Sequence, residues 1–335
     1  MIVIVAPAGD LHGRAVAHEL MSRGVRVYGL DLADLNEGLH LTERVENGRV
    51  DAELRLASGE VILFSEVETI WWRRPRIPDL EEGFAEAAHF VEDEWRHLLE
   101  GMEAMTSTRW VNPPNANRRA GRKAFGLAAA IQEGLRVPET AITNDPEAVR
   151  TLLSEGRPVI YKRIGTAGWH NTATMPFGPG DLQRLGTLVR CPAIFQERID
   201  ARLDIRVTAF GEDLRAVEIE SQAGDGSLDW RLDHTVPFRP HDLERDTARR
   251  LTRVMGTLGL EFAAIDLRLT PEGEYVFLEV NPSGQFLFVE LLAGLPLSTR
   301  MAEFLLEPGR SLVTRDDSCT SGLPVPERAQ QDSNL

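Results

Sequence analysis

Short apolar runs and one helical pattern alternate at the start of the chain. Residues 2–6 form a β-branched run typical of a buried parallel strand, and residues 11–23 have the apolar spacing of an amphipathic helix that ends at Gly24. Another apolar run follows at 25–30. This order predicts a β-α-β unit, and therefore a small parallel α/β lobe at the N-terminus.

The same patterns extend this lobe and mark its end. A hairpin is expected at 49–64, an apolar strand at 69–72 and a long helix at 84–105. The sequence Asn-Pro-Pro-Asn at 112–115 interrupts helix and strand patterns alike, so we place a lobe boundary near it.

The rest of the chain shows helical segments first and strand-rich segments later. We predict helices at 117–134, 146–155, 242–256 and 297–306, and strands at 158–163, 193–199, 204–210, 214–221, 262–269 and 275–280. The expected division is an N-terminal lobe at 1–112, a central lobe at 113–190, a C-terminal lobe at 191–306 and a polar, disordered tail at 307–335. The fold class is α/β, with α+β lobes.

Composition narrows the possible partners. The 335 residues are 42% hydrophobic and carry a net charge of −15, which argues against a nucleic-acid partner. The two cysteines, Cys191 and Cys319, have neither disulfide nor metal-ligand spacing, which fits a reducing cytoplasm. The sequence indicates neither a signal peptide nor an apolar run of roughly 18 residues for a membrane span. We therefore expect a cytoplasmic protein.

The strands expected at 262–269 and 275–280 carry the strongest local chemical signal. If their hairpin is centred between residues 272 and 273, Asp266 lies opposite Glu279, and Phe277 and Asn281 share the face of Glu279. Two carboxylates and an amide oxygen suit Mg²⁺. Solvated acids on a wet strand face explain this pattern equally well.

Two further signals precede this hairpin. Lys162 ends a predicted strand before a loop with Gly165 and Gly168, an arrangement that can neutralise and cover phosphate oxygens. Taken alone, however, a surface lysine before a turn is the simpler reading. The chain has no Walker sequence and no Rossmann glycine fingerprint. Asp204 and Arg206 share one strand face, either as a functional pair or as part of a cross-strand ion pair.

In their order and spacing, these pieces resemble the ATP-grasp superfamily over most of residues 110–306. The matching segments are Gly121-Arg122-Lys123, Gly134 to Thr140, Val159 to Lys162, Phe195 to Ile199, Asp266, and Leu278-Glu279-Val280-Asn281-Pro282. The resemblance implies an ATP-grasp fold, with ATP and Mg²⁺ bound between a central and a C-terminal lobe.

The resemblance also implies roles for individual residues. Phosphates of ATP would be bound by Lys123 and Lys162 under the loop with Gly165 and Gly168, adenine by the hinge with Gln196, Glu197 and Ile199, and Mg²⁺ by Asp266, Glu279 and Asn281. Arg206 would lie at the transferred phosphate, where positive charge offsets the charge that grows during phosphoryl transfer. Asp204 would either orient Arg206 or meet the nucleophile, and Arg231 would also be catalytic.

A narrower resemblance rests on two short segments. Ile70 to Pro75 and Asp229-Trp230-Arg231 are similar to segments of graspetide maturases, the enzymes of microviridin-type macrocycles. It implies a precursor peptide with a leader segment, whose Asp or Glu side chain is phosphorylated and then attacked by a Ser, Thr or Lys side chain. It also implies a homodimer.

Arg73 and Arg74 follow the apolar strand at 69–72, at the strand end where ligands of α/β sheets collect. We expect them to bind the substrate carboxylate. The alternative for both is an exposed basic corner.

Two other functions remain open from the sequence. A ligase that adds an amino acid such as glutamate to a peptide or protein end would use the same ATP site. A non-catalytic ATP-binding scaffold is the alternative from another class. The complete set of charged site residues argues against the scaffold.

Overall fold

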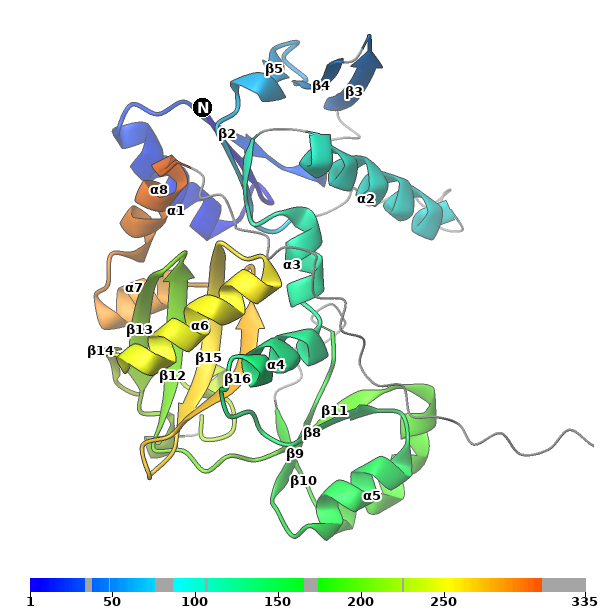
Figure 1. Ribbon diagram of the computed structural model, residues 1–335, viewed down its shortest axis with the longest axis vertical. Coiled ribbons are helices and arrows are strands. Elements are labelled where there is room, and N and C mark those ends of the chain that lie inside the picture. The colour runs from blue at the N-terminus through cyan, green and yellow to red at the C-terminus, as the bar shows by residue number, and fades with distance from the viewer. Residues whose placement is uncertain are drawn as a thin grey trace, which may run out of the picture.

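The computed structural model describes residues 1–33, 38–47, 49–75, 87–105, 108–165, 174–224 and 226–308. Gly168 and residues 309–335 of the expected tail lie outside these ranges. Figure 1 shows the N-terminal lobe at one end of the long axis, the central lobe at the other and the C-terminal lobe between them.

The N-terminal lobe is built on a parallel sheet of order β2-β1-β6-β7, as the β-α-β pattern predicts. Its strands are β1 (Ile2–Val5), β2 (Val27–Leu30), β6 (Thr69–Trp72) and β7 (Arg109–Val111), and its helices are α1 (Leu11–Ser22) and α2 (Ala88–Met105). The expected hairpin is present as β4 (Arg49–Arg55) and β5 (Val61–Leu63). It gains a third strand, β3 (His40–Glu46), which has no buried residue and therefore gave no apolar signal.

The central lobe begins with α3 (Pro114–Ala120) and α4 (Lys123–Gln132), so the single helix predicted at 117–134 is wrong. Arg122 takes an extended backbone conformation, which ends one helix and makes Lys123 the first residue of the next. The lobe's antiparallel sheet has the order β10-β9-β11-β8. These strands are β8 (Thr140–Thr143), β9 (Val159–Lys162), β10 (Met175–Phe177) and β11 (Ala193–Glu197), packed against α5 (Pro146–Ser154) and the 3-10 helix η4 (Pro179–Arg190).

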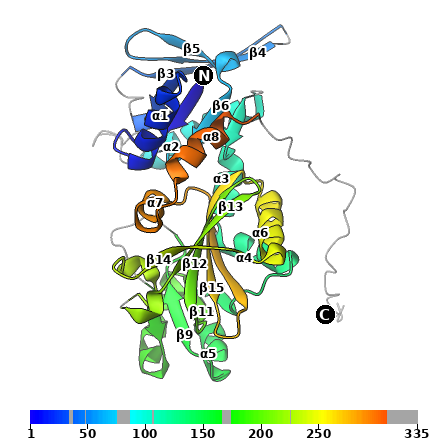
Figure 2. The same ribbon diagram turned by 90° about the vertical axis from the view of Figure 1, so that its left-hand side faces the viewer.

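The C-terminal lobe is a five-stranded antiparallel sheet of order β14-β13-β12-β15-β16. Its strands are β12 (Leu203–Phe210), β13 (Asp213–Ile219), β14 (Phe238–His241), β15 (Phe262–Leu269) and β16 (Tyr275–Asn281). One face packs on α4 and α6 (Arg245–Leu258) through a continuous apolar core (Figure 2). The opposite face of β12 and β15 carries buried charged residues and can therefore form a polar site.

The last two helices, α7 (Leu287–Ala293) and α8 (Leu297–Leu306), lead the chain back to the N-terminal lobe. Figure 2 shows α8 beside α1, and the Thr69 hydroxyl on β6 donates to the Leu305 carbonyl at 3.0 Å. The expected lobe division counts this helix with the C-terminal lobe, and that division stays a prediction. No helix in the described ranges is long and apolar enough to cross a membrane.

Candidate active site

Strands β15 and β16 place Asp266 opposite Glu279, which confirms the predicted pairing. Nearer the turn, however, Leu269 lies opposite Tyr275, so the expected turn centre is wrong. The two registers differ by one residue, and a β-bulge at Leu278 absorbs the difference.

The bulge also changes which side chains share a face. Phe277 lies opposite Leu267 in the apolar core, and not on the face of Glu279 as regular alternation predicts. Leu278 and Glu279 instead both line a cleft on the polar face of the sheet. An extra residue in a strand therefore gives this cleft two consecutive side chains.

The cleft lies between the central and C-terminal sheets. It brings together predicted residues that are far apart in sequence. Those in its lining are Lys162, Gln196, Glu197, Ile199, Asp204, Arg231, Asp266 and Glu279.

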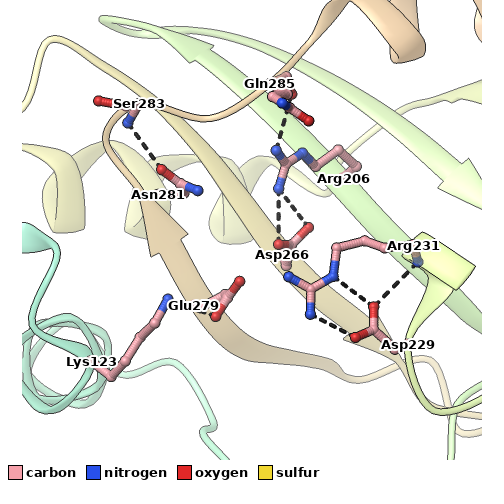
Figure 3. Close-up of polar contacts among 9 residues, drawn as sticks. All are labelled: Lys123, Arg206, Asp229, Arg231, Asp266, Glu279, Asn281, Ser283 and Gln285. Carbon is pink, nitrogen blue, oxygen red and sulfur yellow. Dashed lines mark hydrogen bonds and ion pairs between the residues drawn. The ribbon is translucent and has the colours of Figure 1, made fainter. Parts of the chain in front are cut away.

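Arg206 and Asp266 lie opposite each other on β12 and β15 and form a buried ion pair (Figure 3). One terminal nitrogen of Arg206 donates to both Asp266 oxygens at 2.9 and 2.8 Å. Its other terminal nitrogen donates to the Gln285 carbonyl at 3.0 Å, and its guanidinium lies 5.6 Å from the Trp230 ring centre. The orientation of this arginine is thus fixed before any ligand arrives.

Asp204 makes a separate buried pair. Its carboxylate accepts from Arg268 Nε at 3.0 Å and from the Ser221 hydroxyl. Burial raises the pKa of Asp204, although Arg268 and Ser221 oppose the shift. Because its partners are these two residues, Asp204 does not orient Arg206 by direct contact within this structure.

Glu279 lies among lysines. Lys123 Nζ, at the start of α4, donates to the Glu279 carboxylate at 2.8 Å (Figure 3). Burial opposes ionisation of Glu279, but the charges of Lys123 and Lys162 outweigh it and lower the pKa of Glu279 to about 2. Burial in turn lowers the pKa of Lys162, against the attraction of Glu279. The cleft therefore holds two amines suited to phosphate oxygens.

Arg231 lies in the 3-10 turn η6 (Trp230–Leu232) and is held by Asp229, the residue that caps this turn. Two of its guanidinium nitrogens donate to the Asp229 carboxylate, each at 2.6 Å. This hydrogen-bonded pair raises the pKa of Arg231 despite burial, so the side chain stays cationic. Figure 3 shows its guanidinium directed toward the Asp266 side of the cleft. Arg206 and Arg231 therefore bring two fixed positive charges to the acidic pair.

The donor set for a cation consists of oxygen atoms only. Burial raises the pKa of Asp266, against Arg206 and with the support of the nearby Glu279 charge. The Asn281 side-chain oxygen accepts from the Ser283 amide at 3.0 Å, which fixes its orientation. In the described part of the chain, no three His, Cys, Asp or Glu side chains form a metal cluster. Two carboxylates and one amide fit Mg²⁺, which usually keeps phosphate and water ligands as well.

No protein family model matches this chain, and no curated protein matches it in sequence. Solved structures do match. The macrocyclase MdnC of Microcystis aeruginosa MRC, solved with the precursor peptide MdnA, is 28% identical; the match covers 91% of this chain and 99% of MdnC, with a TM-score of 0.78. The macrocyclase MdnB of the same organism is 27% identical, covering 91% of this chain and 98% of its own, with a TM-score of 0.73.

A third match is the Chryseobacterium gregarium RiPP-associated ATP-grasp ligase, solved with ADP and a leader and core peptide. It is 24% identical, with a TM-score of 0.79 over 91% of this chain and 96% of its own. The chain therefore has the ATP-grasp fold. Its cleft between the two antiparallel sheets is thus an ATP-grasp cleft.

The three residues expected to form the adenine hinge each have a different hydrogen-bond partner. Gln196 is buried and donates to the Thr140 hydroxyl at 2.8 Å. Glu197 accepts from the Glu139 amide at 3.2 Å and lies near Arg157 at 3.8 Å. The Ile199 carbonyl accepts from Arg268 at 2.7 Å, so the hinge is tied to the polar face of the C-terminal sheet.

Three other expected site residues, Gly165, Arg73 and Arg74, do not line the cleft. Gly165 is exposed and is the last described residue before position 174. Arg73 is only 1% exposed and donates to the carbonyls of Ser283 and Gly284. Arg74 contacts the Ser283 carbonyl at 3.4 Å. Neither arginine forms an exposed basic corner, and their binding of a substrate carboxylate stays a prediction.

Sequence reasoning missed three site residues of this ATP-grasp chain. Arg268 lies two residues after Asp266 on β15 and so shares its face, which is the one signal that could have placed it in the cleft. Ser221 and Trp230 come from short 3-10 turns, where no periodicity predicts the direction of a side chain. Their roles follow only from tertiary contacts.

Proposed function

We propose that this protein is an ADP-forming ligase that closes macrocycles in a ribosomal precursor peptide. It would phosphorylate an Asp or Glu side chain, and a Ser or Thr hydroxyl or a Lys amine of the same peptide would then displace phosphate to give an ester or an amide. The main support is the match to two macrocyclases over nearly their full length. A cleft that brings Lys162, Asp266 and Glu279 together supports it further.

The nucleotide would occupy the cleft with its phosphates at Lys123 and Lys162. Both lysines surround Glu279, so they already converge on one point. Asp266, Glu279 and Asn281 would hold Mg²⁺, which when bound neutralises charge on the transferred phosphoryl group. Nucleotide binding would therefore replace the Lys123–Glu279 ion pair with contacts to phosphate.

Arg206 and Arg231 would act on the reacting groups. Their guanidinium groups are already held by Asp266 and Asp229. Fixed positive charge at the point where phosphoryl charge develops lowers the barrier without reorganisation during the reaction. A carboxylate is a poor electrophile, whereas its acyl phosphate is a good one. Because nucleophile and acyl phosphate belong to one peptide, their reaction is intramolecular.

The peptide would be recognised through a leader segment, since reacting side chains alone offer little surface for binding. The homologue from Chryseobacterium gregarium was solved with a leader and a core peptide, which supports this assignment. A homodimer and a cytoplasmic location also remain predictions.

The proposal is tested with a peptide rich in Thr, Ser, Asp and Glu, encoded by a short reading frame beside the coding region. With ATP and Mg²⁺, the peptide mass should fall by one water per link, with ADP and phosphate formed in step. Hydroxylamine added during turnover should trap a hydroxamate on an Asp or Glu side chain.

Each other outcome points to a different function. A hydroxamate found only on a free amino acid or a chain terminus would indicate the amino-acid ligase. AMP and pyrophosphate would exclude the ADP-forming mechanism. ATP binding without turnover in the presence of any such peptide would favour the non-catalytic scaffold.

A further inference from the structure

The residues from Pro282 to Leu287, which we name the 282–287 segment, join the end of β16 to α7. Two proposed site residues depend on its backbone. The Ser283 amide donates to the Asn281 side chain at 3.0 Å, and the Gln285 carbonyl accepts from Arg206 at 3.0 Å (Figure 3). A shift of this segment would therefore move both a proposed magnesium ligand and a proposed catalytic arginine.

Arg73 of the N-terminal lobe holds the middle of the segment. A single terminal nitrogen, Nη1, donates to the Ser283 carbonyl at 2.6 Å and to the Gly284 carbonyl at 2.9 Å. Asp10 lies 3.5 Å from Arg73 Nε and also caps the start of α1. Burial lowers the pKa of Arg73 to about 10, although Asp10 opposes the shift. Burying a guanidinium is costly, and the two carbonyls and Asp10 offset part of that cost.

His12 holds the end of the segment. Its Nε2 accepts from the amides of Phe286 and Leu287 at 3.0 and 3.2 Å. An imidazole that accepts through Nε2 carries its proton on Nδ1 and is neutral. Burial, together with the charge of Arg73, lowers the pKa of His12 to about 4, so this neutral form prevails at pH 7.

The segment also has little freedom to move toward the sheet. A Cβ atom added to Gly284 would lie 2.1 Å from the Ala264 side chain on β15. The backbone is thus pressed against the sheet beside Asp266, while Arg73 and His12 hold it from the N-terminal lobe. Its position is therefore determined from two sides.

We propose that Arg73 and His12 are positioning residues, which fix the 282–287 segment and through it orient Arg206 and Asn281. The N-terminal lobe would in this way set the geometry of phosphoryl transfer without contacting the nucleotide. The catalytic part of this inference rests on the proposed function, whereas the part on Asn281 concerns Mg²⁺-dependent nucleotide binding alone.

The test uses the full-length protein and four variants, one of which is a control. Arg73→Lys keeps the charge but replaces the planar guanidinium with a single amine on a flexible four-carbon stem. His12→Gln keeps a side-chain acceptor, whereas His12→Leu removes it. Arg23→Gln is the matched control, because Arg23 also joins distant parts of the chain, through Glu303 at 3.3 Å, but does not touch the segment.

Two measurements are made on each variant. The first is the Mg²⁺ dependence of binding of a non-hydrolysable ATP analogue, which needs no peptide. The second is kcat and KM for ATP, with the peptide used to test the proposed function. Arg73→Lys and His12→Leu should need more Mg²⁺ for binding and should lower kcat by roughly 10- to 100-fold, since small displacements of catalytic groups cost that much. KM for the peptide should change little.

His12→Gln should recover most of the activity that His12→Leu loses, and Arg23→Gln should match the unmodified protein. If folded Arg73→Lys and His12→Leu keep normal kcat and normal Mg²⁺ dependence, the proposal is wrong. Equal losses in His12→Gln and His12→Leu would also overturn it for His12. If the unmodified protein turns over no peptide, the proposed function fails, while the Mg²⁺ titration still decides the positioning of Asn281.

Discussion

Replacing Glu279 with Gln tests the charge arrangement of the cleft. Glu279 is ionised in the folded protein because Lys123 and Lys162 lower its pKa from 4.5 to about 2 despite burial. A difference of this size corresponds to about 3 kcal/mol of stability that depends on the carboxylate charge. Because the pKa is lowered, this stability is present above pH 4.5 and is lost as the pH falls through about 2.

Glu279→Gln should therefore lower the free energy of unfolding at pH 7 by about 3 kcal/mol in the absence of nucleotide. Urea-induced unfolding of both proteins measures this difference. Glu303→Gln is the control, since its ion pair with Arg23 is half exposed and should be worth less than about 1 kcal/mol. The variant should also lose Mg²⁺-dependent ATP turnover, because the neutral amide is a weaker ligand for Mg²⁺ than a carboxylate.

The two readouts test separate parts of the reasoning. If Glu279→Gln is as stable as the unmodified protein or more so, the cost of burying Glu279 outweighs its attraction to the lysines. If turnover is normal at saturating Mg²⁺, Glu279 is not a magnesium ligand.

Three further predictions concern other parts of the molecule. Lys162→Ala should mainly raise the Kd for ATP, whereas Arg206→Ala should mainly lower kcat. The reason is that only the arginine would meet charge that grows in the transition state. An effect of Arg206→Ala on ATP affinity alone would contradict its role. Asn112→Ala should cost about 2–4 kcal/mol in urea unfolding, since the buried Asn112 amide makes four hydrogen bonds to the backbone at the start of β15 and at Pro282. Lowering the pH from 6.5 to about 4 should lower the free energy of unfolding by up to about 2 kcal/mol. Folding lowers the pKa of His12, so in this range the proton binds to the unfolded chain in preference to the folded one. The loss should be smaller in His12→Gln.

The sequence predicted those parts of the site that lie on regular strands. The predicted pairing of Asp266 with Glu279 is confirmed, although the turn centre from which it was predicted is wrong, because the bulge at Leu278 compensates for the difference. Asp204 and Arg206 share one strand face, as predicted, but their partners are residues of other strands and turns. Such partners depend on strand order, which alternation along one strand does not contain.

The N-terminal lobe shows the same limit. Its apolar strands and helices follow the predicted pattern, since burial of one face imposes periodicity. Arg73 was expected to bind the substrate carboxylate, because it follows a strand at the end where ligands of α/β sheets collect. Its burial results from the 282–287 segment, which is more than 200 positions away in sequence. Burial by a segment this distant in sequence leaves no pattern near Arg73 from which it could be predicted.

Because of the bulge at Leu278, the hairpin could lose one residue without moving its two acids relative to each other. If residue 278 were deleted, Phe277 would still pair with Leu267, and Glu279 would still face Asp266, because the strand would simply continue in the register of its turn. The cleft would lose one apolar side chain and keep both carboxylates. A single insertion or deletion at this point can therefore reshape one wall of the cleft while Asp266 and Glu279 stay opposite each other. Evolution or protein engineering could use this one position to alter the apolar lining of the cleft without moving its two carboxylates.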